Sequence, residues 1–267
     1  MLRRTLFKGI IGILGMIAIP YTANAVISSI KPEESDIVKW AESNIWIHGL
    51  NSPIGGEKIK LLPIQKHILN SWMNNYFNLT VSCRQSGKST MAMIHALYTC
   101  IHTPNHQYTL LDIKGDMAKY TMERILYTFK KLPQYGDLVN TITRDTIVFT
   151  NGSSIVCDYL SHNSVMGRTI DTLNLQEFDF SRNQTDFINC IFPCMKSIPN
   201  AKMIIASTLS DIPETNFKKT MNTDKLNSVW NVEKIHYLDV PYMANRIETI
   251  KTFLTKEEFN REYCNII

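Results

Sequence analysis

From residue 61 onward, the hydrophobic positions switch repeatedly between helical spacing and the continuous apolar runs of buried strands. Helical spacing predicts helices at residues 63–72, 88–101, 117–131 and 185–195. Apolar runs predict strands at residues 79–83, 107–113, 172–175, 203–207 and 232–238. Strands that alternate with helices indicate the α/β class, with a mostly parallel central sheet that helices flank on both faces.

A β-hairpin is predicted to interrupt this alternation. The apolar runs 146–149 and 154–160 flank Asn151-Gly152. Asn-Gly is typical of hairpin turns because both residues tolerate positive φ. We therefore expect a pair of antiparallel strands beside the parallel ones.

Three segments of the chain differ in composition. Residues 1–30 form an apolar leader with a basic start, an apolar run at 9–19 and an Ala-Asn-Ala end. This pattern predicts a signal peptide or an extra helix, and the run is shorter than the roughly 20 residues of a membrane-spanning helix. Residues 31–57 are polar and turn-rich, which predicts a connector with one short helix at 36–42. The remaining residues, 58–267, are predicted to form one domain.

Composition and charge limit the classes of function. The chain has 267 residues, of which 44% are hydrophobic and 19% charged, a globular balance. Its net charge is +4, and Arg3, Arg4 and Lys8 supply three of those charges, so the rest carries no general basic footprint for nucleic acid. Any nucleic-acid contact must be local or made by an assembly. The six cysteines are scattered without a CxxC pair, which predicts free thiols and no zinc site.

Residues 83–90, Cys-Arg-Gln-Ser-Gly-Lys-Ser-Thr, lie between a predicted strand and a predicted helix. In such a Walker A loop, backbone N–H groups and the helix N-terminus hold phosphate oxygens, Lys88 reaches the β- and γ-phosphates, and Ser89 holds Mg²⁺. The usual pattern has a glycine where this chain has Ser82. The loop predicts ATP and Mg²⁺ as ligands, and its further contacts are assigned to Cys83, Gln85, Ser86, Gly87 and Thr90.

An acidic residue follows the predicted strand at 172–175. Glu177 is the candidate carboxylate that polarises the attacking water and reaches Mg²⁺ through water. An aspartate usually precedes this glutamate, and Gln176 is a poorer Mg²⁺ ligand than a carboxylate. Metal affinity should suffer as a result. Two alternatives remain open: Glu177 is an ordinary strand-end acid, or Asp179 compensates for Gln176.

Two further polar features lie near ends of predicted elements. Ser207 and Thr208 follow a buried strand, where α/β sheets bind ligands, so they are placed to sense the γ-phosphate. Gln65 lies upstream of the loop, and its paired donor and acceptor suit an adenine edge. The alternatives are strand-end hydroxyls in a turn and a solvated glutamine on a helix.

Together these motifs resemble the ATPase domain of the large terminase subunit of tailed bacteriophages, the motor that packages DNA into the prohead. Residues 83–90 match the family's loop, [S/C]-R-Q-x-G-K-[ST]-[ST], including Arg84 and Gln85. Other stretches are similar to the family's adenine motif (62–65), N-G-S hairpin (150–155), glycine turn (166–168), acidic motif (176–180) and coupling motif (207–208). The resemblance covers roughly residues 58–265.

The resemblance implies a RecA/ASCE-like P-loop fold and roles for several residues. Arg84 would act on the γ-phosphate, Glu177 would be catalytic, and Ser207 and Thr208 would couple hydrolysis to movement. The implied partners are double-stranded DNA, the portal and the small terminase subunit, with a homo-oligomeric ring as the assembled form. The implied location is the cytoplasm of the infected host cell, although the leader argues against it.

The chain departs from the family at several points. Gln176 replaces the metal-associated aspartate, and Leu209 replaces the proline common after the coupling hydroxyls. No acidic RNase H-like pattern follows the ATPase region, so we expect no nuclease activity from this chain and leave open a separately encoded nuclease half. A non-catalytic or degenerate nucleotide-binding packaging component is one alternative function. A helicase-like ATPase is another, but the residues after Thr208 are too few for the second RecA-like domain it needs.

Overall fold

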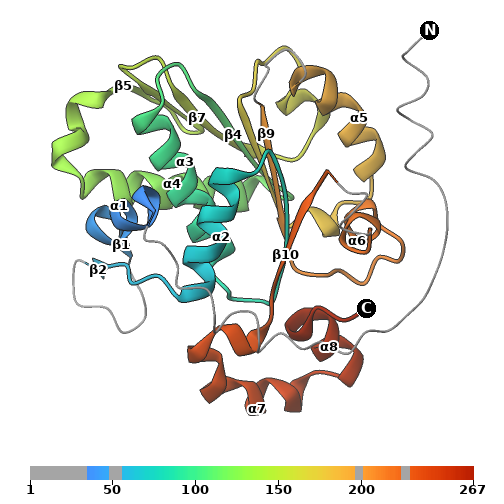
Figure 1. The fold of residues 1–267 in the computed structure, drawn as a ribbon. Helices are drawn as coiled ribbons and strands as arrows, with labels where there is room; N and C mark the ends of the chain where they lie inside the picture. Colours follow the sequence, from blue (N-terminus) through green and yellow to red (C-terminus); the bar gives the residue numbers. More distant parts are fainter. Residues whose placement is uncertain (1–34, 48–55, 196–200, 224–228) are drawn as a thin grey trace, which may run out of the picture. The chain divides into compact units, whose positions relative to one another are not determined.

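A computed structural model describes residues 35–47, 56–195, 201–223 and 229–267 (Figure 1). The predicted leader and parts of the predicted connector lie outside the described residues. Residues 34–267 belong to one compact unit. The described helices include none that is long and apolar enough to cross a bilayer.

Eight strands of the described segments form the central sheet. Their order is β10 (Asn231–Ile235), β3 (Phe77–Ser82), β9 (Lys202–Ser207), β8 (Thr172–Gln176), β4 (Gln107–Asp112), β7 (Ser154–Tyr159), β6 (Thr146–Phe149) and β5 (Val139–Ile142). Neighbours from β10 to β7 pair in parallel, whereas β7 with β6 and β6 with β5 pair antiparallel. The predicted α/β class and mostly parallel sheet are confirmed, and the predicted hairpin is the β6–β7 pair.

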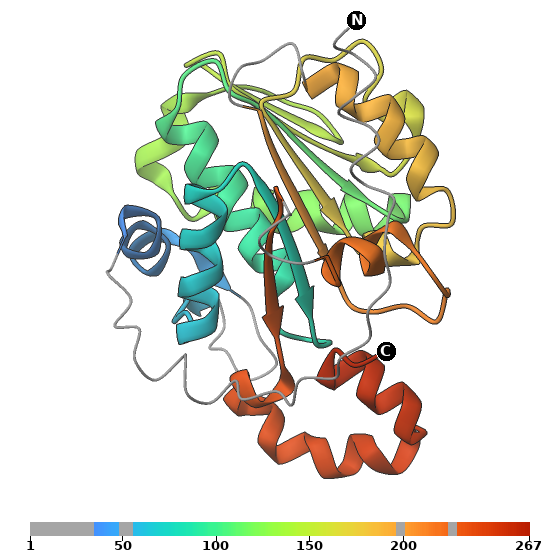
Figure 2. The same ribbon diagram turned by 45° about the vertical axis from the view of Figure 1, so that its right-hand side comes forward.

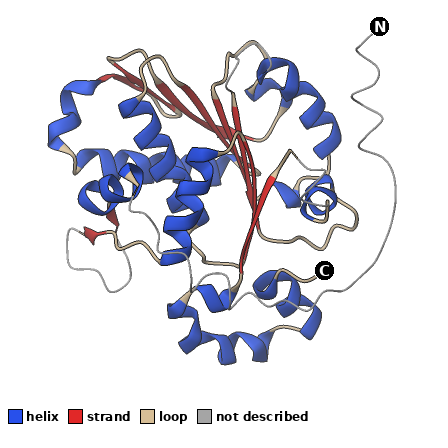
Figure 3. Ribbon diagram, viewed as in Figure 1, coloured by secondary structure: helices blue, strands red, loops and turns tan. Residues whose placement is uncertain are grey.

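Helices cover both faces of this sheet (Figure 3). One face carries α1 (Asp36–Asn44), α2 (Pro63–Asn74), α3 (Lys88–His102) and α4 (Gly115–Lys130), and the other carries α5 (Gln184–Met195) and α6 (Asn216–Met221). In β9, Ile204 and Ala206 belong to the first core, and Met203 and Ile205 belong to the second. A single strand supplies both cores because successive side chains point to opposite faces.

The two remaining helices lie beyond the end of the sheet. The helices α7 (Ala244–Phe253) and α8 (Lys256–Cys264) follow β10 and lie past the end at which that strand finishes (Figure 2). A short antiparallel pair, β1 (Trp46–Ile47) with β2 (Glu57–Lys58), lies apart from the main sheet.

The strand order decides what lies together at the carboxyl edge of the sheet. The strand β9 lies between β3 and β8 and is parallel to both. The carboxyl ends of these three strands therefore meet at one edge. The P-loop follows β3, Thr208 follows β9 and Glu177 follows β8, so three motifs far apart in sequence become neighbours.

Candidate active site

The P-loop, residues 83–87, joins β3 to α3. Gln85 and Gly87 have left-handed φ angles of 60° and 91°. This region favours glycine, so Gln85 holds a conformation that a non-glycine residue rarely adopts and that is common at functional sites. Ser82 stands where the usual pattern has glycine, but it is a buried strand residue in register with Ile235. A side chain is accommodated there because the backbone is still that of the sheet.

Gln65, a residue of α2, forms a hydrogen bond with the backbone of the P-loop. Its Nε2 donates to the Ser86 carbonyl oxygen at 2.9 Å, and its Oε1 accepts from the Leu62 amide at 3.0 Å. A Cβ at position 87 would lie 2.5 Å from Gln65 Nε2 and would displace that side chain, and the φ of 91° at this position also favours glycine. Both ends of the amide are engaged by backbone groups in this structure. Its predicted contact with adenine stays a prediction.

Lys88, Thr208 and Glu177 form the centre of the site. Lys88 is only 7% exposed, and its Nζ donates to Thr208 Oγ1 at 2.9 Å and lies 3.2 Å from Glu177 Oε1. The Thr208 amide donates to Glu177 Oε2 at 3.2 Å. Glu177 has a left-handed φ of 52°, again an uncommon conformation for a residue with a side chain. Three residues that the sequence singled out separately thus contact one another.

A small pocket opens beside this centre. Its volume is about 210 Å³, and its lining comprises residues 85–90, Arg124 and Glu177. Pockets for whole ligands usually measure roughly 300–1,000 Å³, so this one suits the phosphate part of a nucleotide. The N-terminus of α3 also lies here, and helix N-termini favour anions. Ser86 Oγ is buried without a hydrogen-bond partner among the described residues. These features together fit phosphate oxygens.

Arg84 and Cys83 contribute to the loop in different ways. The Arg84 guanidinium forms an ion pair with Glu262 of α8, and the Arg84 amide donates to the Glu262 carbonyl oxygen at 3.1 Å. Its predicted action on the γ-phosphate stays a prediction. Burial raises the pKa of the Cys83 thiol to about 12, so the thiol is neutral. The Cys83 amide donates to the Ile235 carbonyl oxygen at 2.9 Å and continues the pairing of β3 with β10.

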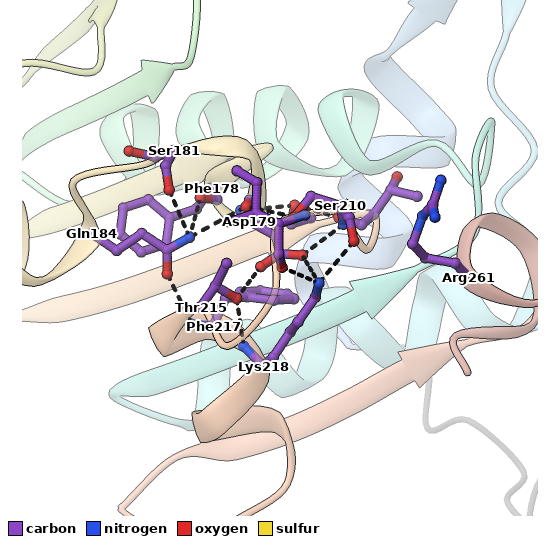
Figure 4. A network of polar contacts seen from close by, with 12 residues as sticks. Phe178, Asp179, Ser181, Gln184, Ser210, Thr215, Phe217, Lys218 and Arg261 are labelled. Atoms are coloured by element: carbon purple, nitrogen blue, oxygen red, sulfur yellow. Dashed lines mark hydrogen bonds and ion pairs between the residues drawn. The ribbon is translucent and has the colours of Figure 1, made fainter. Parts of the chain in front are cut away.

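Behind Glu177, a buried polar network centres on Asp179 (Figure 4). Its amide donates to Ser207 Oγ at 3.1 Å, and its carboxylate accepts from the Ser210 amide at 2.7 Å and from the Thr215 hydroxyl. Lys218 Nζ lies 3.8 Å from the same carboxylate. Both carboxylate oxygens are therefore engaged away from the P-loop. The structure does not support the alternative in which Asp179 compensates for Gln176; the network instead connects Ser207 with α6.

Gln176 lies next to an acid that the sequence analysis missed. Gln176 is 1% exposed, its Nε2 donates to Asn174 Oδ1 at 2.6 Å, and its Oε1 has no partner among the described residues. Asp112, at the end of β4, is its register partner. Burial, and to a lesser extent the charge of Glu177, raise the pKa of Asp112 to about 6. The strand-end rule that singled out Glu177 applies equally to Asp112.

Mg²⁺ needs oxygen ligands, and the pocket offers a hydroxyl and a carboxylate. Among the described residues, no group of three or more His, Cys, Asp or Glu side chains is arranged to hold a metal. Mg²⁺ usually keeps several waters and is shared between one or two protein oxygens and substrate phosphates. Ser89 and Glu177 both line the pocket and supply such oxygens. These residues fit a Mg²⁺ ion that the protein and the nucleotide phosphates coordinate together.

The chain is similar to phage terminases in sequence and in fold. Residues 79–255 match the family model described as the N-terminal part of the T4-like-virus type of terminase large subunit. The fold is similar to a mutant ATPase domain of the Thermus phage P74-26 large terminase, with a TM-score of 0.62, 18% identity and coverage of 78% of this chain and 94% of that one.

Two longer structures share the fold. The bacteriophage HK97 large terminase has a TM-score of 0.68 and 16% identity, with coverage of 87% of this chain and 54% of that one. A large terminase from a thermophilic bacteriophage, solved with ATP-γ-S, has a TM-score of 0.55 and 11% identity, with coverage of 78% and 53%. The chain thus spans about half the length of these two proteins.

Proposed function

This chain belongs to the family of phage terminase large subunits, and we propose that it is the ATP-hydrolysing motor domain that drives DNA into the prohead. One observation carries the proposal: Lys88, Thr208 and Glu177 contact one another at the edge of a phosphate-sized pocket formed by the P-loop. Each residue comes from the end of a different element, and each is of the type that ATP hydrolysis needs at that place.

The contacts suggest how the residues act. Phosphate oxygens would replace Glu177 as the partner of the Lys88 ammonium, which leaves the carboxylate free to accept a proton from the attacking water. Mg²⁺ beside Ser89 would supply positive charge to the transferring phosphate. Thr208 touches both Lys88 and Glu177, so a change at the γ-phosphate would reach the loop after β9.

Hydrogen bonds around Ser207 support the proposed coupling role of Ser207 and Thr208. Ser207 Oγ accepts from the Asp179 amide, and Asp179 is bonded to Ser210 and Thr215 in the segment that leads into α6. A shift of Thr208 would therefore be passed through Ser207 to this network. We propose that this network converts hydrolysis into movement of the α6 region.

The proposed motor acts on double-stranded DNA in the cytoplasm of the infected host cell, as a homo-oligomeric ring with the portal and the small terminase subunit. The near-neutral charge outside the leader is consistent with a ring that gathers local DNA contacts.

Two substitutions test the proposal. Lys88→Ala should abolish measurable ATP binding because the pocket loses its innermost cation. Glu177→Gln should keep ATP binding and reduce hydrolysis by roughly 10²–10⁴-fold, since an amide cannot act as a general base. Calorimetric titration measures binding, phosphate release with double-stranded DNA measures turnover, and circular dichroism checks the fold. Unchanged affinity of folded Lys88→Ala contradicts the P-loop assignment, and unchanged turnover of Glu177→Gln places the catalytic residue elsewhere.

Gln176 favours a second candidate function, a nucleotide-binding packaging component that does not hydrolyse ATP. The position usually held by the metal-associated acid is a buried neutral amide bonded to Asn174. A parent protein that binds ATP but releases no phosphate in the presence of DNA would establish this function instead of the motor.

A further inference from the structure

A second cation, Arg124, lines the phosphate pocket from α4, and neither the motifs nor the proposed mechanism uses it. The pocket is lined by Arg124 together with the P-loop and Glu177. The Arg124 guanidinium donates from Nη2 to the Thr90 hydroxyl, in the first turn of α3. The helix α4 thus brings a guanidinium directly to the start of the phosphate-binding helix.

The charge of Arg124 is not matched by a carboxylate among the residues that the structure describes. Among the described residues, none of the ion pairs includes Arg124, and its neighbour Glu123 pairs with Lys119. Glu177, the acid that lines the pocket, is paired with Lys88. The aromatic ring of Tyr120 lies 5.9 Å from the guanidinium carbon, and a ring face stabilises a cation only weakly.

Partial burial of this cation disfavours its charged form. Burial lowers the pKa of Arg124, so the charged form loses hydration that no carboxylate replaces. A guanidinium offers several donors, and its hydrogen bond to Thr90 uses one of them. The rest are available to an anion in the pocket, and Arg groups bind phosphate oxygens well because their planar donors match the geometry.

We propose that Arg124 is a phosphate-binding residue of this site and contacts a phosphate that ATP and ADP share. Lys88 is the side chain that reaches the β- and γ-phosphates, whereas Arg124 lies beside Thr90, further into α3. Its contact is therefore expected on the α- or β-phosphate and not on the γ-phosphate. The inference rests on the proposed function, because it takes the pocket to be a nucleotide site.

The test compares Arg124→Gln, Arg124→Lys and the parent, with Lys119→Gln as the matched control. Lys119 is on the same helix and exposed, so its substitution removes one positive charge without touching the pocket. Dissociation constants for ATP and ADP are measured by calorimetry, and the melting temperature is measured without nucleotide. We expect Arg124→Gln to weaken ATP and ADP by the same factor, roughly 10- to 100-fold. Arg124→Lys should fall between Arg124→Gln and the parent, and Lys119→Gln should match the parent.

The outcomes separate the binding role from a structural one. A lower melting temperature with parental affinities would show that Arg124 only supports the packing of α3 and α4, and would overturn the inference. Weakening of ATP alone would place the contact at the γ-phosphate and also overturn it. A parent protein that binds neither ATP nor ADP would overturn the proposed function itself, and this inference with it.

Discussion

At the residue scale, Gln176 is the clearest departure from the chemistry of a nucleotide hydrolase. Its side chain is buried, bonded to Asn174, and opposite Asp112 in the sheet register. A carboxylate at position 176 would therefore add a third acid to a region that already holds Asp112 and Glu177. Like charges in a buried site raise one another's pKa values, so the neutral amide limits repulsion when no nucleotide is bound.

Gln176→Asp should lower the Mg²⁺ concentration needed for half-maximal ATP hydrolysis, by roughly 10-fold. The reason is that changes in the shell around a metal commonly alter its affinity or the activity by about 10–100-fold. The added charge should also lower the melting temperature. Hydrolysis is followed against Mg²⁺ concentration with DNA present. Gln176→Asn is the control, because it has the same length as aspartate without the charge.

If ATP hydrolysis depends on Mg²⁺ concentration in the same way for Gln176→Asp, Gln176→Asn and an active parent, the amide does not limit the affinity for Mg²⁺. Three inactive proteins would instead favour the non-catalytic function. The comparison thus also decides between the two proposed functions.

Residue types were predictable from the sequence here, but partners were not. Lys88 and Glu177 were assigned from motif spacing, and the structure places Lys88 Nζ 3.2 Å from Glu177 Oε1. Asp112 was missed because it lies inside the predicted strand at 107–113, whereas β4 ends at Asp112. Arg124 was missed because it matters only through a residue that is distant in sequence. Asp112 becomes significant through its register with Gln176, and Arg124 through its contact with Thr90.

At the scale of elements, α8 and the turn before α7 both contact the P-loop. The Glu262 side chain binds Arg84, and the Tyr242 hydroxyl donates to the Gln85 carbonyl oxygen. Both contacts come from the segment that follows β10. The P-loop conformation is therefore linked to the C-terminal helices, and an Arg84 that turns toward a γ-phosphate must leave Glu262.

Glu262→Gln should raise the affinity for ATP roughly two- to fivefold, because a partly exposed ion pair contributes about 0.2–1 kcal/mol and its loss releases Arg84. The affinity for ADP should not change, since ADP lacks the γ-phosphate. Both affinities are measured by calorimetry. Glu257→Gln, which alters an exposed acid of the same helix, serves as the control. An equal effect on ATP and ADP would contradict a γ-phosphate role for Arg84.

Elements with strong hydrophobic periodicity were predictable, and those without it were not. The predicted strand at 107–113 and helix at 117–131 differ from β4 and α4 by at most two residues at either end. The strand β5 was missed because most of its residues are exposed, and α7 because Ile247 is its one buried residue. For α8 a signal existed, since Thr255 and Glu258 form a capping box.

At the scale of the whole molecule, the strand order assembles the site and could not be derived from the sequence. Hydrophobic runs identify strands, but the placement of β9 between β3 and β8 depends on how all the helices pack. The same order puts Asp112 beside Gln176 near Glu177 and Lys88. An acid held there without a full partner affects the free energy of unfolding of the entire domain.

Burial raises the pKa of Asp112 from 3.8 to about 6. The folded protein therefore binds this proton more tightly than the unfolded chain does. The contribution of Asp112 to stability is fully present below about pH 4 and is lost as the pH rises through 6. Asp112 is thus a source of instability at neutral pH, as is common for acids retained at functional sites.

Asp112→Asn should therefore stabilise the protein at pH 7.5 and have little effect at pH 4. Each pKa unit corresponds to about 1.36 kcal/mol, so the gain at pH 7.5 should be on the order of 2–3 kcal/mol. Asparagine keeps an oxygen that can accept from the Ile113 amide, as Asp112 Oδ1 does at 2.8 Å. The free energy of unfolding is measured by urea titration at both pH values, with exposed Asp137→Asn as the control.

A stability difference that is the same at pH 4 and pH 7.5 would show that the charge of Asp112 is not what costs stability. If the gain appears at pH 7.5 while ATP hydrolysis falls, the acid is kept for the reaction and the domain gives up stability to hold it.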